Sequence, residues 1–240
     1  MFRTTITRTD GTSSTGTATE AHALSLLRRA ERWEHCAVEA TRRGGAIIER
    51  RMWEGGIMRT RKIDLEPLTP LGSITPTMRG ALDAIAARDA YLVTDAVDIF
   101  RSRNGRICAG LESIPPTASK RLVDRSLVVL GTPYPSTSNG YLPETRTPVR
   151  LSLSARLALH AKDHRTRTGE PLGYVKPMDV GLNAIGLNKG GRRGGTIYDG
   201  TSAASCTCRG WAGTFERRMF ALDQARIHRQ EATAALVRTL

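Results

Sequence analysis

Two cysteines and a histidine near the C-terminus are the residues of this chain best suited to metal chemistry. Cys206 and Cys208 are separated by one residue, and His228 follows after nineteen more. Thiolate and imidazole are ligands of tetrahedral zinc sites, in which paired cysteines are usually two to four residues apart. The Cys-x-Cys spacing is therefore one residue too tight for a standard finger, and Ala232 stands where a second helical histidine would help. Zinc binding by these three residues needs a fourth ligand from elsewhere.

The candidates for the fourth ligand are the two remaining cysteines and one histidine pair: Cys36, Cys108, and His160 with His164. The two histidines are four residues apart and would share a helix face. Their simpler explanation is a basic helix C-terminus that the helix dipole favours. The simpler explanation of the two late cysteines is a tight turn with buried thiols and Trp211 packed on the following helix. The sequence leaves both alternatives open.

Catalytic motifs are absent from the sequence. There is no Gly-x-Ser-x-Gly, no His-Glu-x-x-His and no dinucleotide-binding fingerprint, and the five histidines are scattered along the chain. Such motifs place a nucleophile, a metal or a cofactor at a defined local geometry. We therefore expect that the protein is not an enzyme and has no cofactor other than the zinc considered above.

The charge of the chain points to an anionic partner. Its 240 residues carry 36 Lys and Arg against 23 Asp and Glu, a formal charge of +13, and 31 of the 36 are arginines. This excess excludes an acidic solubilising protein. The planar guanidinium bonds two acceptors at once and suits phosphate and guanine. Codon bias in a G+C-rich genome is the alternative explanation of the arginine content.

Neither a leader nor a membrane span is visible in the sequence. No apolar run follows the charges near the N-terminus, and nowhere do about 18 apolar residues follow one another. Four cysteines in a chain of this length do not indicate a secreted disulfide framework. We expect a cytoplasmic protein that does not engage a membrane.

Residues 1–66 predict a small α+β unit. A strand at 3–8 and a helix at 19–31 come first, and a meander of three strands follows at 33–41, 46–53 and 57–65. Gly-Gly pairs separate these last runs, which is typical of tight hairpins. Two prolines and a glycine then break the pattern, so we place a linker at 67–74.

The central region, 75–165, alternates helical and strand patterns. Thr75 is a good N-cap, Pro76 fits the first helical position, and the apolar spacing that follows predicts a core-facing helix. A strand is expected from 90 and a turn or two of helix at 107–113. A second amphipathic helix is expected at 117–127, then strands at 127–131 and 148–153, and a closing helix at 154–162.

This region resembles a winged helix-turn-helix domain over residues 71–163. The resemblance lies in the segments TPTMRGALDAIA (75–86), PTASKRLVDRSLV (116–128) and VRLSLSARLAL (149–159). Ser126 departs from the family, which often has Gly there, and the second helix is poorly marked. The resemblance implies a recognition helix at 117–127 in the major groove and a wing beside it. The DNA-contacting residues that it implies are Thr117, Ser119, Lys120, Arg121 and Arg125 of the helix and Arg146 and Arg150 of the wing.

The last third of the chain contains a segment without a regular pattern, followed by a segment that predicts regular structure. Residues 166–200 are rich in Gly, Pro and Arg, and Lys189, Arg192 and Arg193 form a basic run among glycines. Such a run can follow a phosphate backbone or act as a flexible linker. Residues 201–240 predict a Cys-x-Cys knuckle and a C-terminal helix. The fold class expected is thus α+β, a central winged helix flanked by the N-terminal unit and this basic tail.

Together these features lead to one preferred function and two alternatives. We expect a DNA-binding protein, a transcriptional regulator or a phage or plasmid accessory factor, reading duplex DNA with helix 117–127. A homodimer on a palindromic site would be ordinary for such a protein. The alternatives are a protein-interaction module that uses the winged helix as a scaffold, and a binder of RNA or single-stranded DNA through the Gly/Arg tail.

Overall fold

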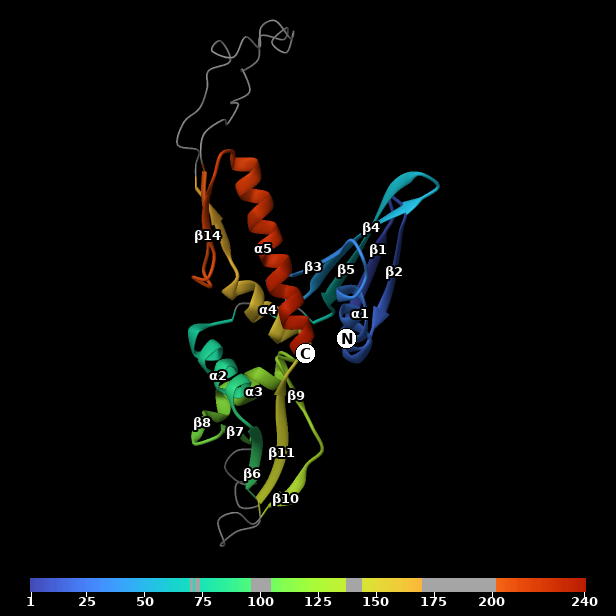
Figure 1. The fold of residues 1–240 in the computed structure, drawn as a ribbon. Coiled ribbons are helices and arrows are strands. Elements are labelled where there is room, and N and C mark those ends of the chain that lie inside the picture. The colour runs from blue at the N-terminus through green and yellow to red at the C-terminus, as the bar shows by residue number, and fades with distance from the viewer. Residues whose placement is uncertain (70, 72–73, 96–104, 137–143, 170–201) are drawn as a thin grey trace, which may run out of the picture.

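The fold of the chain consists of helices packed on antiparallel sheets. The computed structural model describes all residues except 70, 72–73, 96–104, 137–143 and 170–201. The described residues form five helices and three antiparallel sheets (Figure 1). The prediction of an α+β fold built on a central winged helix is therefore wrong. The central region forms a six-stranded antiparallel sheet, where a winged helix would have only a two-stranded wing.

The first sheet is built from the N-terminal residues. Its elements are β1 (Phe2–Thr7), β2 (Ser13–Ala18), α1 (Glu20–Glu31), β3 (Cys36–Ala40), β4 (Ala46–Glu54) and β5 (Ile57–Pro67), and the strand order is β2-β1-β5-β4-β3. Thr19 caps α1 by accepting a hydrogen bond from the His22 backbone N–H at 3.1 Å. The expected strands, helix and meander are present, and β2 is an additional strand in a stretch of Ser, Thr and Gly.

The second sheet occupies the central region. Its elements are α2 (Pro76–Ala87), β6 (Ala90–Asp95), β7 (Arg106–Ala109), β8 (Glu112–Ile114), α3 (Pro116–Asp124), β9 (Val128–Leu130), β10 (Tyr134–Ser136), β11 (Glu144–Leu151) and α4 (Leu153–Asp163). The strand order is β10-β11-β6-β7-β8, and β9 also pairs with β11. As the sequence predicts, Thr75 caps α2 with Pro76 in its first turn.

The local helices of the central region form where the sequence predicts them, but the strands pair differently. A hairpin, β7–β8, replaces the helical turns expected at 107–113, and Gly110 enters its turn with φ +60°. This left-handed conformation is accessible to glycine at little cost. The strand β6 then joins β11 to β7, so that the expected wing becomes part of a six-stranded sheet. Helical spacing alone did not specify these pairings between distant segments.

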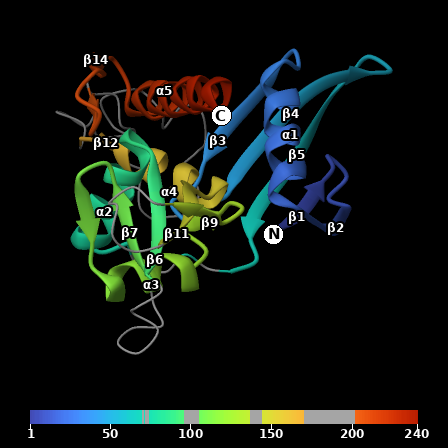
Figure 2. The ribbon, with the colours of Figure 1, turned by 90° about the horizontal axis from the view of Figure 1, so that it is seen from below.

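The third sheet and the last helix form the C-terminal region. The sheet order is β12-β13-β14, from β12 (Thr166–Thr168), β13 (Ser202–Cys206) and β14 (Ala212–Phe215), and α5 (Arg218–Thr239) follows. Figure 2 shows α5 running past one end of the first sheet. Lys189, Arg192 and Arg193 lie outside the described residues. In the part of the chain that the structure describes, no helix has the length and apolar content needed to cross a membrane.

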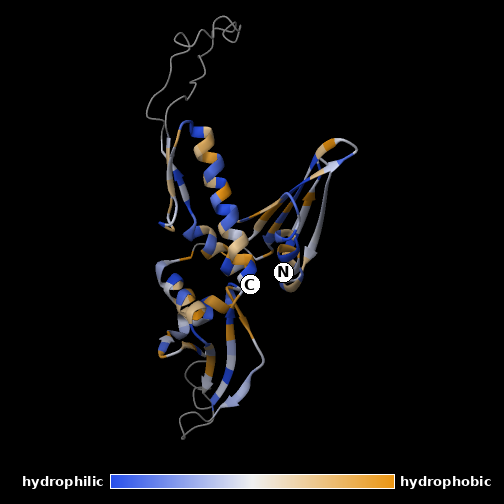
Figure 3. Ribbon diagram, viewed as in Figure 1, coloured by the Kyte–Doolittle hydropathy of each residue, from blue (hydrophilic) through white to orange (hydrophobic). Residues whose placement is uncertain are grey.

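Helix α4 joins the two hydrophobic cores of the molecule. Leu153 and Leu157 pack in the core of the first sheet, together with Phe2, Leu27 and Ile48 from that sheet and α1. Other side chains of the same helix, Ala155, Ala158 and Leu159, belong to the core of the second sheet. Figure 3 shows hydrophobic residues interleaved with hydrophilic ones along the helices and strands. The C-terminal end of α4 is thereby held in a fixed position.

Candidate metal centre

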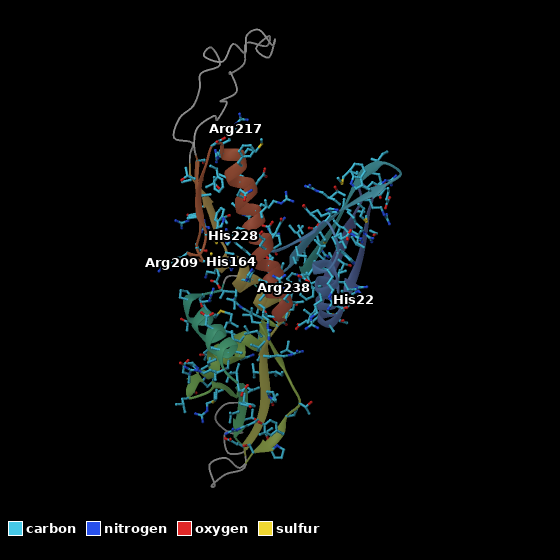
Figure 4. All side chains as sticks on the ribbon, in the orientation of Figure 1. His22, His164, Arg209, Arg217, His228 and Arg238 are labelled. Carbon is cyan, nitrogen blue, oxygen red and sulfur yellow. The ribbon has the colours of Figure 1, made fainter. Side chains whose placement is uncertain are left out.

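Four potential metal ligands converge at the end of α4. They are His164, Cys206, Cys208 and His228, and their ligand atoms all lie within 4.8 Å of one another. The Cys208 Sγ lies 3.5 Å from the His228 Nε2, and the Cys206 Sγ lies 3.9 Å from the His164 Nδ1. Figure 4 shows His164 and His228 side by side where α4 and α5 meet. This Cys2His2 cluster could hold a metal ion.

Strand register brings His164 to the two cysteines. His164 follows the last residue of α4, and its backbone N–H donates to the His160 carbonyl at 2.9 Å. The adjoining strand β12 pairs antiparallel with β13, with Thr166 opposite Cys206. Two residues before Thr166 therefore lie opposite two residues after Cys206. This register places His164 beside Cys208.

The residue between the cysteines fastens their turn to α4. The Thr207 hydroxyl donates to the Asp163 carbonyl at 2.6 Å and accepts from the Arg165 backbone N–H at 3.0 Å. The Thr207 backbone N–H donates to the Arg165 carbonyl at 3.0 Å. These bonds fix the two thiols relative to His164 without using either sulfur atom.

The turn after Cys208 reverses the chain tightly. Arg209 has φ +61°, and its backbone N–H donates to the Cys206 carbonyl at 3.1 Å. The Cys206 N–H donates to the Trp211 carbonyl at 2.9 Å and closes the loop. A left-handed non-glycine residue costs about 1 to 2 kcal/mol, so the surrounding bonds hold this turn in its shape. The result is a knuckle in which the Cys206 Sγ faces His164 at the end of α4 and the Cys208 Sγ faces His228 of α5.

Helix α5 supplies His228 and is anchored at further positions along its length. The Thr233 hydroxyl accepts a hydrogen bond from the Ala40 N–H at 3.2 Å, and the Arg229 guanidinium donates to Glu39 at 2.6 Å. The helix is thus fixed against β3 at the residue after His228 and again five residues beyond His228. The Trp211 ring stacks on the His228 ring with centroids 5.0 Å apart and planes 9° from parallel. The indole shields one side of the cluster and orients the imidazole.

Burial shifts the pKa values of two residues of the cluster. It raises the pKa of the Cys206 thiol and lowers the pKa of His228, to which the neighbouring His164 also contributes. It also lowers the pKa of His160, whose ring lies 4.4 Å from the His164 ring and is tilted from it by 35°, to about 4. Neutral imidazoles offer a lone pair to a metal, whereas a buried thiol needs a cation to stabilise its thiolate. A divalent ion would supply that cation.

The sequence identified three of the four clustered residues. Cys206, Cys208 and His228 were the predicted ligands, and the structure brings them together. Among the alternatives for the fourth ligand, His164 joins them, while Cys36 in β3 and Cys108 in β7 lie outside the cluster. The pattern that could have selected His164 is its place directly before a short strand that leads back to the cysteines.

The exposed face of α3, the helix predicted to contact DNA, carries both paired and unpaired basic side chains among the described residues. Thr117, Lys120 and Arg121 of α3 are exposed. Lys120 is paired with Asp124 at 2.8 Å, one turn further along the helix. Arg121 has no carboxylate partner among the residues that the structure describes.

Ser119 and the remaining arginines have different surroundings. Ser119 is only 1% exposed, and its hydroxyl accepts from the Ile107 N–H at 2.9 Å and donates to the Ile114 carbonyl at 3.1 Å. Its assignment as a DNA-contacting residue is therefore wrong, because it ties α3 to the β7–β8 hairpin. Arg125 contacts the Met78 sulfur at 3.8 Å, and Arg146 is paired with Glu144 at 2.7 Å. Arg150 is exposed on β11.

Comparison of the chain with protein-family models, with curated proteins and with solved structures finds no match.

Proposed function

We propose that the protein binds one zinc ion through His164, Cys206, Cys208 and His228, and that this ion is a structural centre. The observation that carries the proposal is the convergence of two thiols and two imidazoles within 4.8 Å. With Zn–S near 2.3 Å and Zn–N near 2.0 Å, the edges of a tetrahedral site are about 3.3 to 3.8 Å long. The two sulfur–nitrogen distances of 3.5 and 3.9 Å lie close to that range.

The donor set favours zinc and a structural role. Two thiolates and two imidazoles match borderline-soft ions with tetrahedral preference, of which zinc is the common one. Four protein ligands close the coordination sphere and leave no position for a reactive water. The ion would join the end of α4, the knuckle after β13 and the middle of α5.

Elemental analysis of the purified, tag-free protein tests the proposal. We expect about one zinc per chain in the wild type and in the Cys108→Ser control, and loss of zinc in Cys208→Ser and His228→Asn. Because a ligand variant can fail to fold, the metal-free wild type is also reconstituted with Co²⁺. A tetrahedral cobalt spectrum with thiolate-to-cobalt charge transfer supports the proposal. Zinc-free wild type that takes up no Co²⁺, or zinc retained in both ligand variants, overturns it.

We propose duplex DNA binding as the second candidate function. It is favoured by the net charge of +13, together with exposed arginines such as Arg121 and Arg150 that lack a carboxylate partner within the described part of the chain. Cations without partners can neutralise phosphates and release condensed counterions. The test is titration of a random-sequence duplex with full-length protein at several salt concentrations.

The role of α3 in that binding is tested separately. Replacing Lys120 and Arg121 by Ala should weaken affinity and lower the salt dependence if α3 faces the duplex. An unchanged affinity excludes the helix as the contact surface and leaves the DNA-binding proposal intact. Absence of any salt-sensitive affinity in the wild type overturns the DNA-binding proposal itself.

A further inference from the structure

The β4–β5 hairpin extends beyond the sheet to which it belongs. The neighbouring strands stop at its base, where β3 pairs Cys36 with Arg50 and β1 pairs Thr7 with Lys62. Residues 51–61 continue as a two-stranded ribbon, here called the arm, that ends at Gly55 and Gly56. The hydroxyl of Thr9 accepts from the Thr60 N–H at 2.8 Å and donates to the Thr60 carbonyl at 3.0 Å, supporting one edge of the base. Figure 1 shows the arm projecting away from the other elements.

The arm carries large apolar side chains that nothing in the described structure covers. Trp53 is 66% exposed, Ile57 63% and Met58 45%. Trp53 and Met58 are directly opposite and share one face, while Glu54 and Ile57 are opposite on the other. A two-stranded ribbon with exposed apolar side chains gains little stability by itself. Such a concentration of apolar surface is typical of an interaction site.

Arginines flank the apolar side chains on both faces of the arm. Arg51 shares the face of Trp53, and Arg59 and Arg61 share the face of Ile57. Three arginines against the single Glu54 give the arm a net charge of +2. Glu54 and Arg59 form a 3.4 Å pair that is about half exposed, so its contribution is small. Arg51 and Arg61 have no carboxylate partner in the described residues.

We propose that the arm binds duplex DNA by entering a groove between the two phosphate backbones. This inference rests on the proposed DNA binding and assigns its contact surface. The four residue pairs beyond the Arg50–Arg61 pair, together with the turn, make a ribbon about 15 Å long. A two-stranded ribbon fits the major groove, which is about 12 Å wide and 8.5 Å deep. With cations on both faces, the arm meets a phosphate backbone on either side, while Trp53 and Ile57 contact bases at the tip.

The position of Glu54 favours DNA over a lipid surface. An apolar tip with arginines behind it would also suit an anionic membrane, but Glu54 stands at the tip beside the turn. Inserting a carboxylate among acyl chains carries a large desolvation cost. In a major groove the same carboxylate can accept a hydrogen bond from the cytosine amino group. The charge pattern of the arm therefore matches a polar groove better than a bilayer.

The experiment compares two variants with the same change in charge, using the full-length protein with its metal bound. In the arm variant Arg51, Arg59 and Arg61 are replaced by Gln. In the control, three exposed arginines in the last turn and C-cap of α1 are replaced in the same way: Arg28, Arg29 and Arg32. Affinity for a fluorescent random-sequence duplex is measured by anisotropy over a salt series. We expect the arm variant to bind about tenfold or more weakly, with a log–log salt slope lower by about 2 to 3. The control should stay within about twofold of the wild type.

A second pair of variants tests the tip. Trp53→Ala should weaken binding about tenfold because apolar contact with the base edges is lost, whereas Trp53→Phe, which keeps an apolar ring, should bind nearly as well as the wild type. These positions are exposed, so zinc content and melting temperature should not change.

Each other outcome overturns the inference in an identifiable way. If the wild type binds duplex but the arm and α1 variants weaken equally, or only the α3 variant weakens, the arm is not the contact and DNA binding stands. If the arm is needed for phosphatidylserine vesicles but not for duplex, the partner is a lipid surface. If the wild type binds no duplex, both the inference and the DNA-binding proposal fail.

Discussion

The N-terminal sheet and the C-terminal knuckle are held together by different means. The first sheet buries large apolar side chains between its strands and α1, among them Phe2, Leu27 and Ile48. The third sheet buries only small or polar ones, Ser202, Ala204 and Cys206, and the half of α5 that faces it contributes Ala221 and Ala225. Among the described residues of 202–230, no Leu, Ile, Val, Phe or Met is buried.

This difference explains why the C-terminal region would need a metal for its stability. Burial of a large apolar side chain contributes about 1.5 to 3 kcal/mol, and alanines contribute much less. Small units without a sufficient core are commonly held by a disulfide or a metal. The Cys2His2 cluster lies where the apolar side chains are missing, so the ion would stabilise the C-terminal region as the core stabilises the N-terminal one.

Removing the metal should produce the largest difference in stability between the two regions. Structural zinc binding contributes on the order of 10 kcal/mol in small zinc-dependent units. After chelation we expect the amide hydrogens of residues 202–230 to exchange much faster, while those of β1, β4 and β5 keep their protection. Hydrogen exchange read by mass spectrometry measures both regions in one sample. Equal loss of protection in both, or none in either, contradicts the comparison.

A core substitution should produce the opposite pattern. Leu27 is fully buried under the first sheet, so Leu27→Ala should lower the free energy of unfolding of that region by about 2 to 5 kcal/mol. The loss should be the same with and without chelator, because no metal supports this core. Urea denaturation followed region by region measures it. Leu111→Ala is the control, because Leu111 is fully exposed and its truncation should change little.

The contact between the two regions should contribute less to the free energy of unfolding than either the metal cluster or the apolar core of the first sheet. The buried Thr233 hydroxyl links α5 to the Ala40 N–H of β3 and donates to the Arg229 carbonyl at 2.8 Å. Thr233→Val leaves that N–H without its partner and should cost about 1 to 3 kcal/mol. Thr233→Ser keeps the hydroxyl and should cost clearly less. A larger loss in Thr233→Ser than in Thr233→Val, which keeps the methyl group, would mean that packing of that methyl group, not the hydrogen bond, joins the regions.

The comparison also explains which features could be predicted from the sequence. Thr75 with Pro76 specifies a helix start locally, and Gly55 with Gly56 specifies a tight turn, with φ values of +58° and +79° in the structure. These features depend on a few adjacent residues. The N-terminal unit, whose hairpins connect neighbouring strands, was accordingly predicted well.

The strands that were missed carry no apolar alternation of their own and form only because another strand pairs with them. The strand β2 consists of Ser, Thr, Gly and Ala with no apolar alternation, and it exists because β1 pairs with it. The strand β13 is similar, and its partner β12 precedes it by more than thirty residues. Because that register places His164 beside Cys208, the fourth ligand could be named only as one of several alternatives.

The smallest effect expected is a difference in reactivity between the thiols of the two regions. Burial raises the pKa of Cys36 in β3 to about 11, although the nearby Arg50 opposes the shift. A raised thiol pKa keeps the protonated form, so at pH 8 Cys36 should hold about 100-fold less thiolate than an ordinary cysteine and alkylate correspondingly slowly. Its rate should rise with pH up to about 11, and chelation should not change it, because no metal contacts this thiol.

Cys206 and Cys208 should behave oppositely, protected while the metal is bound and alkylated once it is removed. Mass spectrometry of iodoacetamide-labelled peptides, with and without chelator across a pH series, distinguishes the sites. Chelator-dependent labelling of Cys36, or chelator-independent labelling of Cys206, would contradict the claim that the metal supports the C-terminal region alone.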